Sequence, residues 1–159
     1  MLDDEAIARY ARQIVVPGIG AAGQEKLLAS TVLVAGNQRG CDQAALYLRA
    51  AGVRVVRWTE PDCDADVVLV ADATSLDEAT RLALVKRGKP ICWYVVDELG
   101  FTSGVHPAAR LPSPRSAGEE SNPLTSAAVH DAAACDAASA ACAIVIGLDW
   151  RSGPFRLEM

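Results

Sequence analysis

Residues 31–52 read TVLVAGNQRGCDQAALYLRAAG, and this stretch decides the fold. Val32 to Ala35 form a short apolar run without charge, which predicts a strand covered on both faces. A helical pattern follows from about Asp42 to Ala51, with Gly52 placed as its C-terminal cap. In a doubly wound α/β fold, nucleotide phosphates sit at the first strand–turn–helix unit, against the helix N-terminus. The stretch therefore predicts such a fold and marks a candidate nucleotide site.

The turn between this strand and helix, Gly36 to Asp42, lacks the composition of a phosphate-binding loop. Glycines let the backbone approach a phosphate, whereas the side chain of Gln38 takes up that space. Asp42 stabilises the start of a helix but repels a phosphate. Arg39 either attracts an anion or is a solvated turn residue, and we favour the second interpretation. We predict that Gln38 and Arg39 fill the turn and that it holds no nucleotide.

Composition narrows the class of protein. The chain has 159 residues, 51% of them hydrophobic, and a net charge of −5, so we expect one globular domain that does not bind nucleic acid. We expect no apolar run to span a membrane, and the acidic N-terminus is unlike a signal peptide, which predicts a cytoplasmic protein. Five cysteines without a C-x-x-C pair, and two histidines, predict reduced thiols and no metal site.

Further elements follow from hydrophobic periodicity and from glycine and proline signals. Strands are expected at 54–58, 66–71, 90–96, 101–106 and 155–159, and helices at 3–10, 23–29, 76–87 and 125–147. The last helix is rich in alanine, and an apolar stripe that includes Ala128, Ala132, Cys135 and Cys142 is expected to pack against the sheet or a dimer mate. Four prolines within 107–123 predict a mobile loop.

Three segments resemble one known family closely. Residues 9–36, RYARQIVVPGIGAAGQEKLLASTVLVAG, and residues 44–53, AALYLRAAGV, are similar to the N-terminal part of the ThiF/MoeB/HesA family. Residues 72–96, DATSLDEATRLALVKRGKPICWYVV, resemble the strand–helix–strand that follows in that family. The resemblance implies an enzyme that uses ATP and Mg²⁺ to adenylate the C-terminal glycine of a ubiquitin-like sulfur carrier, usually as a homodimer.

The expected fold is therefore α/β: a Rossmann-like, mostly parallel sheet flanked by helices, in a shortened ThiF-type domain. Within a single domain over 1–159, the N-terminal helical dimerisation segment would be 1–30 and the Rossmann-like core 31–106. A mobile crossover loop at 107–123 and a long helix with a terminal strand at 124–159 would complete it.

Carried over residue by residue, the family's active site is incomplete. Of the family's G-x-G-G-x-G turn only Gly36 remains, since Gln38, Arg39 and Cys41 occupy the other glycine positions. Glu60 matches the acid that binds the ribose hydroxyls, or it is a surface acid. The family's positively charged contacts to the γ-phosphate lie in a segment that is missing after Asp62.

The metal and thiol positions are also altered. Ser75 stands where the family has its Mg²⁺-binding aspartate, while Asp72 remains beside it. Arg12 matches the arginine that family dimers lend to the neighbouring active site, or it helps to hold the dimer. The family's crossover-loop cysteine has no counterpart within 107–123, and Cys135 is expected to pack inside the last helix.

Three hypotheses follow. The first is a degenerate member without a cofactor, a homodimer that binds a ubiquitin-like sulfur carrier or an active paralogue. The second is an adenylyltransferase or sulfurtransferase with a site rebuilt from Arg39, Glu60 and Cys41, the last activated at a helix start. The third, a nucleotide-binding module of another class such as an oxidoreductase, is disfavoured because the chain has no G-x-G-x-x-G motif.

Overall fold

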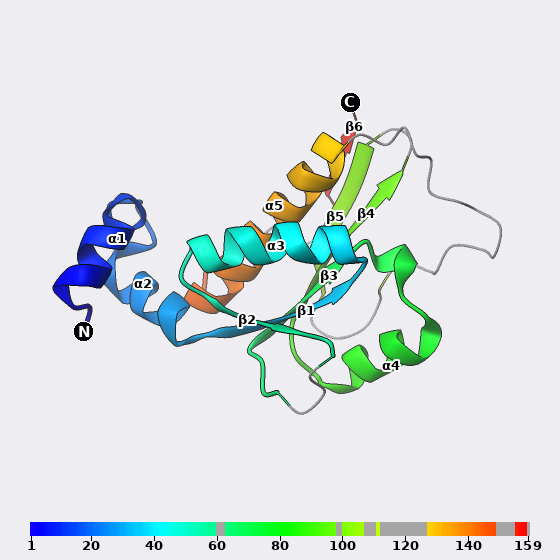
Figure 1. The fold of residues 1–159 in the computed structure, drawn as a ribbon, viewed down its shortest axis with the longest axis horizontal. Helices are drawn as coiled ribbons and strands as arrows, with labels where there is room; N and C mark the ends of the chain where they lie inside the picture. Colours follow the sequence, from blue (N-terminus) through cyan, green and yellow to red (C-terminus); the bar gives the residue numbers. More distant parts are fainter. Residues whose placement is uncertain (60–62, 98–99, 107–110, 112–126, 149–154, 159) are drawn as a thin grey trace.

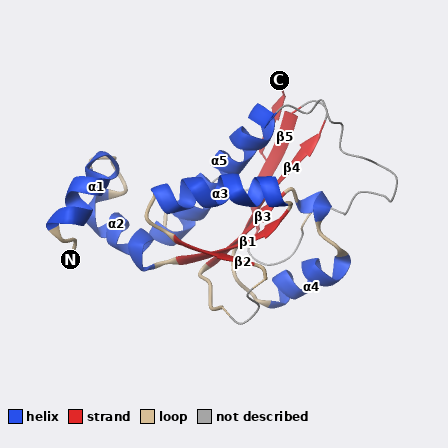
Figure 2. Ribbon diagram, in the orientation of Figure 1, coloured by secondary structure: helices blue, strands red, loops and turns tan. Residues whose placement is uncertain are grey.

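A single mixed sheet with helices on both faces makes up the body of the protein (Figures 1 and 2). The computed structural model describes residues 1–59, 63–97, 100–106, 111, 127–148 and 155–158. The elements are α1 (Asp4–Ile14), α2 (Gly20–Ala29), β1 (Thr31–Gly36), α3 (Gln38–Ala50), β2 (Arg54–Arg57), β3 (Val67–Ala71), a 3₁₀ turn η1 (Ala73–Ser75), α4 (Glu78–Lys86), β4 (Ile91–Asp97), β5 (Gly100–His106), α5 (Ala127–Ile146) and β6 (Phe155–Glu158).

The strand order is β2-β1-β3-β4-β5-β6. Strands β2, β1, β3 and β4 are parallel, and β5 and β6 add to them in antiparallel fashion. The mostly parallel, Rossmann-like sheet predicted from the sequence is confirmed. The predicted loop at 107–123 falls, apart from Leu111, outside the described residues.

Alternation along the strands divides the core into two layers. In β1, Val32 and Val34 face the layer that contains α3 and α5, whereas Leu33 and Ala35 face the layer that contains α4. Strand β3 alternates in the same way and all five of its residues are buried, as expected for a central parallel strand. The period of two thus directs consecutive side chains to opposite faces of the sheet.

Helix α5 bears on two expectations. Of the predicted stripe, Val129, Ala138 and Ala141 are buried, whereas Ala128 and Ala132 are exposed, so only part of it packs against the sheet. Within the described residues, α5 also has the length and mean hydropathy (1.4 over an 18-residue window) of a membrane span. Half of that window is buried in the protein, which is typical of a core helix.

The N-terminal helices attach to the far end of α3 through two glutamine side chains. The Gln13 amide donates to the carbonyl of Ala50 at 3.0 Å, and the Gln24 amide donates to the carbonyl of Ala51 at 2.9 Å. Both carbonyls are at the C-terminal end of α3, where helices leave carbonyl groups without intrahelical partners. Gln13 and Gln24 therefore cap α3 and hold α1 and α2 on the body.

Two helix boundaries differ from the sequence-based prediction. Helix α3 begins at Gln38, four residues before the expected start at Asp42, because Asn37 caps it. Helix α4 begins at Glu78 rather than at Leu76, because Leu76 is extended and Asp77 caps the helix by accepting a hydrogen bond from the Thr80 amide. The predicted cap Gly52 is confirmed, with φ at +94°.

Replacing Gly36 by alanine tests the close approach of β1 and β3. Gly36 has φ at +121°, and a Cβ there would overlap the carbonyl oxygen of Ala71. We predict that Gly36→Ala lowers the free energy of unfolding by about 3–5 kcal/mol, from strain and overlap together. The matched control is Gly88→Ala, at φ +65° with open space around it, which should cost about 1 kcal/mol by strain alone. Equal losses in urea denaturation would contradict the proposed clash.

Candidate functional site

The candidate site lies at the carboxyl ends of β1 and β3. From β1 the chain runs through α3 to β2, which pairs with one edge of β1, while β3 pairs with the other edge of β1. In doubly wound sheets this switch in strand order is where ligands bind. Gly36, Asn37, Gln38 and Asp72 lie there, next to the first turn of α3.

Asn37 connects α3 to β3. Its side-chain oxygen accepts a hydrogen bond from the Gly40 amide at 2.7 Å, and its side-chain nitrogen donates to a carboxylate oxygen of Asp72 at 3.2 Å. The Cys41 amide bonds to the Asn37 carbonyl at 3.0 Å. A phosphate at a helix N-terminus needs such amides free. The protein's own side chain already satisfies the amide of Gly40.

Asp72 is buried, with 6% of its surface exposed, in a left-handed conformation with φ at +55°. Besides Asn37, its carboxylate accepts from the hydroxyl of Thr74 at 2.7 Å, and its carbonyl accepts from the hydroxyl of Ser75 at 2.7 Å. Non-glycine residues adopt this conformation only where the surroundings hold them. Asp72 is therefore a structural centre of the loop after β3.

Gly40 accommodates Tyr94. The hydroxyl of Tyr94, which is fully buried in β4, lies so close to Gly40 that a Cβ at Gly40 would overlap it. Among the described residues this hydroxyl has no hydrogen-bond partner, and burial first of all raises the pKa of Tyr94. Only glycine in the first turn of α3 allows the ring of Tyr94 to reach beneath the helix.

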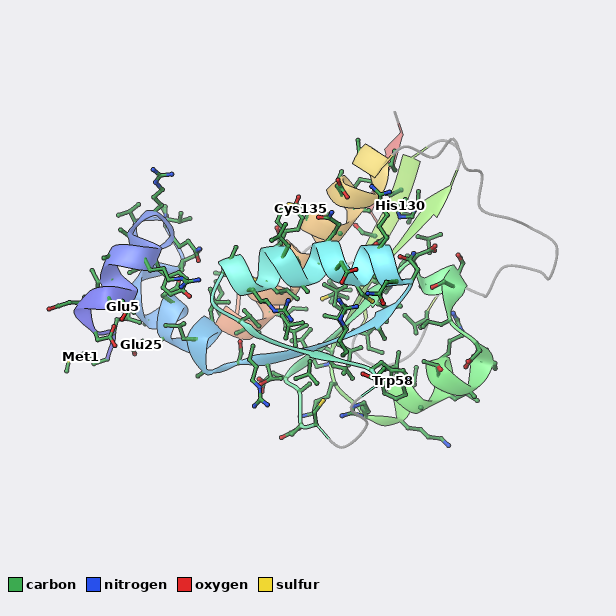
Figure 3. All side chains as sticks on the ribbon, in the orientation of Figure 1. Met1, Glu5, Glu25, Trp58, His130 and Cys135 are labelled. Atoms are coloured by element: carbon green, nitrogen blue, oxygen red, sulfur yellow. The ribbon has the colours of Figure 1, made fainter. Side chains whose placement is uncertain are left out.

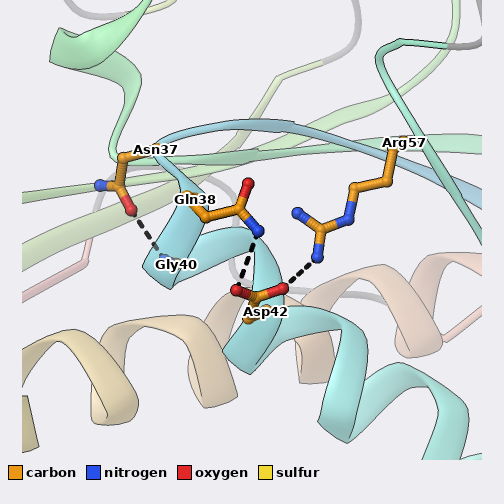
Figure 4. Close-up of polar contacts among 5 residues, drawn as sticks. All are labelled: Asn37, Gln38, Gly40, Asp42 and Arg57. Carbon is orange, nitrogen blue, oxygen red and sulfur yellow. Dashed lines mark hydrogen bonds and ion pairs between the residues drawn. The ribbon is translucent and has the colours of Figure 1, made fainter.

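Asp42, Gln38 and Arg57 form a polar group in front of α3 (Figure 4). Asp42 accepts from the Gln38 amide at 3.0 Å and pairs with the guanidinium of Arg57 from the end of β2. The hydrogen bond from Arg57 lowers the pKa of Asp42, with a smaller contribution from Gln38. Arg57 is thus a cation beside the turn, and its charge is already paired with a carboxylate.

The other predicted cations are directed elsewhere. Arg39 is exposed and lies 4.0 Å from Asp131 of α5, so it does not fill the turn as predicted. Arg12 is on α1, at the opposite end of β1 from the site (Figure 1). Glu60 lies outside the described residues. Within one chain, the structure therefore brings together Gly36, Gln38, Cys41, Asp72 and Ser75.

A cavity of about 220 Å³ remains beside these residues. Its lining includes Gln38, Arg57, Trp58, Ser75 and Asp77, so the prediction that Gln38 fills the turn holds only in part. Ligand pockets usually measure about 300–1,000 Å³, so this cavity is small for a nucleotide. The amide of Thr80 lowers the pKa of Asp77, which keeps a second negative charge at the rim.

Cys41 does not have the environment of a reactive thiol. It is 3% exposed, and burial raises its pKa to about 11 against the lowering effect of Arg57. The predicted activation at a helix start is therefore wrong, because Cys41 lies at the inner side of α3 within the core. Among the residues described, no three His, Cys, Asp or Glu side chains converge to hold a metal ion.

Comparison with known proteins gives partial sequence matches. An adenylyltransferase and sulfurtransferase MOCS3 from Anopheles gambiae is 51% identical over 53 residues, which are 33% of this chain and 12% of the relative. The vegetative HesA protein of Trichormus variabilis is 46% identical over 52 residues, 33% of this chain and 20% of the relative. The chain thus spans a fifth or less of the length of these relatives. No protein-family model matches the chain.

Solved structures match over nearly the whole chain. PaaA aligns with a TM-score of 0.67 at 16% identity, covering 94% of this chain and 68% of PaaA. Escherichia coli MccB aligns with a TM-score of 0.61 at 12% identity, covering 93% and 66%. The chain is similar to a shortened, ThiF-like member of the ThiF/MoeB/HesA family. Sequence likeness is confined to about a third of this ThiF-like chain, and the shared fold covers almost all of it.

Three residues that shape the ThiF-like site were not singled out from the sequence. Asn37 was read as part of a turn, although Asn is a preferred N-cap residue and signals a helix start. The sequence places Arg57 in a strand but does not indicate its ion pair with Asp42. Tyr94 was assigned only to an apolar strand, and no sequence signal links it to Gly40.

Thiol alkylation tests the burial of Cys41. Iodoacetamide reacts with the thiolate, so a pKa of about 11 predicts slow reaction near neutral pH. We expect Cys41 to be modified at least about tenfold more slowly than the half-buried Cys63 and Cys135, as followed by peptide mass spectrometry. Modification of Cys41 before Cys135 in the folded protein would show that the thiol is accessible and ionised.

A double-mutant cycle tests the packing of Gly40 on Tyr94. Gly40→Ala should lower the free energy of unfolding by about 2–4 kcal/mol because the new methyl group meets the Tyr94 hydroxyl. Tyr94→Phe, which removes a buried hydroxyl without a partner, should be neutral or stabilising by about 1 kcal/mol. The double variant should recover about 1 kcal/mol or more of the loss. If the two substitutions changed the free energy of unfolding additively, the methyl group at residue 40 would not be clashing with the Tyr94 hydroxyl.

Proposed function

We propose that this ThiF-like domain does not adenylate a substrate and acts instead as a homodimeric binding or scaffold protein. The observation that carries the proposal is the junction of β1 and α3. There Asn37 caps the helix directly after the strand, so that the Gly40 amide is occupied by the protein itself. An adenylating enzyme would use this position for phosphate oxygens.

The charges around the junction support the proposal. Transfer of a nucleotide group depends on cations that neutralise phosphate charge as it develops. Here the carboxylates of Asp42, Asp72 and Asp77 surround the start of α3, and the neighbouring Arg57 already pairs with Asp42. A triphosphate entering the cavity would meet more negative than positive charge among the described side chains.

Ser75 gives independent support. Mg²⁺ is bound in enzymes by one or two carboxylates together with substrate phosphates. The Ser75 hydroxyl donates to the Asp72 carbonyl, and the Asp72 carboxylate already accepts hydrogen bonds from Asn37 and Thr74. Within the described part of the site, Ser75 therefore offers Mg²⁺ no carboxylate, and the carboxylate of the neighbouring Asp72 is already hydrogen-bonded.

The partner that we propose is a ubiquitin-like sulfur carrier or an active paralogue, in the cytoplasm. Matched relatives are named adenylyltransferase and sulfurtransferase, and the resemblance to their family suggests this class of partner. The N-terminal helices, which Gln13 and Gln24 fix to α3, supply a rigid surface for assembly.

A second candidate function is an adenylyltransferase or sulfurtransferase with a rebuilt site. It is favoured by the cavity at the carboxyl ends of β1 and β2, whose lining combines an aromatic ring, Trp58, with a cation, Arg57. These side chains have the chemistry to hold a base and a phosphate. The buried Cys41 would have no part in such a reaction.

Calorimetry with Mg-ATP separates the two functions. The proposal predicts no binding tighter than about 1 mM and no ATP–pyrophosphate exchange in the presence of a candidate carrier. Arg57→Ala serves as the matched variant, because it removes a cation that lines the cavity. Micromolar binding by the wild-type chain that disappears in Arg57→Ala would establish a working nucleotide site and overturn the proposal.

Co-elution tests the partner class. A purified ubiquitin-like sulfur carrier that ends in Gly-Gly should shift the protein to a larger complex in size-exclusion chromatography, without ATP. The same carrier lacking its last two residues tests whether its C-terminus is needed. Separate elution at tens of micromolar, for both the carrier and an active paralogue, would remove both partners from the proposal.

A further inference from the structure

Strand β2 forms one edge of the sheet and is less covered than the strands beside it. Every residue of β3 is buried, whereas in β2 Arg54 is exposed and Val55 and Arg57 are half-buried. Parallel strands are normally joined by a crossover of a dozen or more residues that contains a helix. The connection from β2 to β3 has only nine residues, 58–66, and its described part contains no helix. This edge of the sheet is therefore sparsely covered.

The backbone of β2 directs two residues outward. The amide of Arg54 donates to the carbonyl of Ser30 at 3.0 Å and so faces the side of β1. Because successive strand residues alternate, the N–H and C=O groups of Val55 and Arg57 face away from β1. In the part of the chain that the structure describes, no strand pairs with this side of β2. We call Val55 and Arg57, with their outward backbone groups, the open edge.

The open edge lacks two of the devices that commonly keep other strands away. Proteins block exposed edges with proline, with a bulge or with charged side chains. Strand β2 contains no proline, and its four residues pair with β1 in unbroken register. The charge of Arg57 is directed to Asp42 on α3 by their ion pair (Figure 4). The backbone groups of the open edge therefore remain accessible to another strand.

An exposed leucine of α3 lies beside the open edge. Leu46 comes four residues after Asp42, so both are on the side of α3 that faces Arg57. Because α3 connects two parallel strands, it runs back along the sheet, and four helical residues rise about 6 Å, roughly two strand residues. This places Leu46, which is 61% exposed, level with Val55. An apolar side chain on an added strand would cover both.

Cations lie near both ends of the open edge. At its start, Arg49 and Arg54 are exposed, and neither is in a salt bridge among the described side chains. After its end, Trp58 lies toward α4, and the guanidinium of Arg87 is 5.8 Å from the centre of the Trp58 ring (Figure 3). Complementary charge selects among partners, so these cations favour a segment with acidic residues.

We infer that the open edge receives an extended, acidic segment of a partner protein, which joins the six-stranded sheet as an additional strand. An acid of this segment lies beside Arg54, and the apolar residue next to it covers Val55 and Leu46. In strand addition, main-chain hydrogen bonds supply affinity and side chains supply specificity. The inference rests on the binding role in the proposed function and names the surface and the chemistry of the partner segment.

A symmetric peptide tests the open edge. The probe is a capped heptapeptide, serine–glutamate–valine–threonine–valine–glutamate–serine, which presents the same order in both strand directions. It should bind with a Kd of about 1 mM or tighter, and at about 5 mM it should slow hydrogen exchange of the Val55 and Arg57 amides at least about threefold by NMR. The amides of Arg54 and Val56, which face β1, should be unchanged. Absence of binding at about 5 mM, or protection that does not alternate, would overturn the inference.

Reversal of one charge tests the acidic character of the segment. Arg54→Glu should weaken binding of the probe at least about threefold at low ionic strength. It should also strengthen binding of the same peptide with lysine in place of both glutamates. Lys86→Glu makes the same change at an exposed position of α4 and should leave the preference for the glutamate peptide intact. Equal binding of both peptides by the wild-type chain would contradict an acidic segment.

Proline at the open edge tests the backbone contact. Val55→Pro removes an outward N–H without removing a hydrogen bond to β1, a position where edge strands tolerate proline. The variant should keep a cooperative melt by circular dichroism and lose protection of the Arg57 amide by the probe. A folded Val55→Pro variant that binds the probe as tightly as the wild type would show that the backbone of the open edge takes no part.

The outcomes separate this inference from the proposed function. A sulfur carrier that co-elutes with the protein but leaves the Val55 and Arg57 amides unprotected would overturn the open edge and leave the binding role standing. Micromolar binding of Mg-ATP, together with alternating protection by the probe, would overturn the proposed function and leave the open edge standing. Protection that rises with protein concentration alone would show that a second copy occupies the open edge, which would contradict the inference.

Discussion

The two hydrogen bonds of the Asn37 side chain hold together the centre of this protein. One ends in the first turn of α3 and the other in the loop after β3, so a single amide joins the two elements that meet at the switch in strand order. The positive φ of Gly36 brings β1 against Ala71, and Gly40 lets Tyr94 fit beneath the helix. Each of these contacts depends on α3 starting at Gln38. The first turn of α3 is thereby held against the loop after β3 and against β4 by the protein's own side chains.

Side chains also close the other end of α3. Gln13 and Gln24 belong to the N-terminal segment that resembles the ThiF/MoeB/HesA family, and both donate to carbonyls at the C-terminal end of the helix. This gives the N-terminal motif a structural role that needs no nucleotide. Helix α3 is fixed at one end by Asn37 and at the other by α1 and α2, and it packs along α5 in the same layer.

Much of the fold could be predicted from the sequence, because strands such as β1 and β3 show the apolar runs that burial on both faces requires. The start of α3 could not, since comparison with a glycine-rich turn made Asn37 look like a loop residue when it is an N-cap. The buried face of α5 could be predicted only in part, because alanine occurs on all sides of the helix and the hydrophobic periodicity is therefore weak. The position of Cys41 near a helix start predicts a lowered pKa, but burial in the core has the larger effect and raises it. The contacts of Arg57 and Tyr94 join distant strands and helices, so local sequence does not reveal them.

The most direct test of the central claim is to observe the amides of α3 by ¹⁵N NMR during titration with Mg-ATP. If Asn37 occupies the helix start, the Gly40 amide should exchange slowly with solvent. The resonances of Gln38, Arg39 and Gly40 should stay in place up to millimolar nucleotide. Progressive, saturable shifts of these three amides, with faster exchange at Gly40, would show that phosphate displaces the cap and would contradict the account.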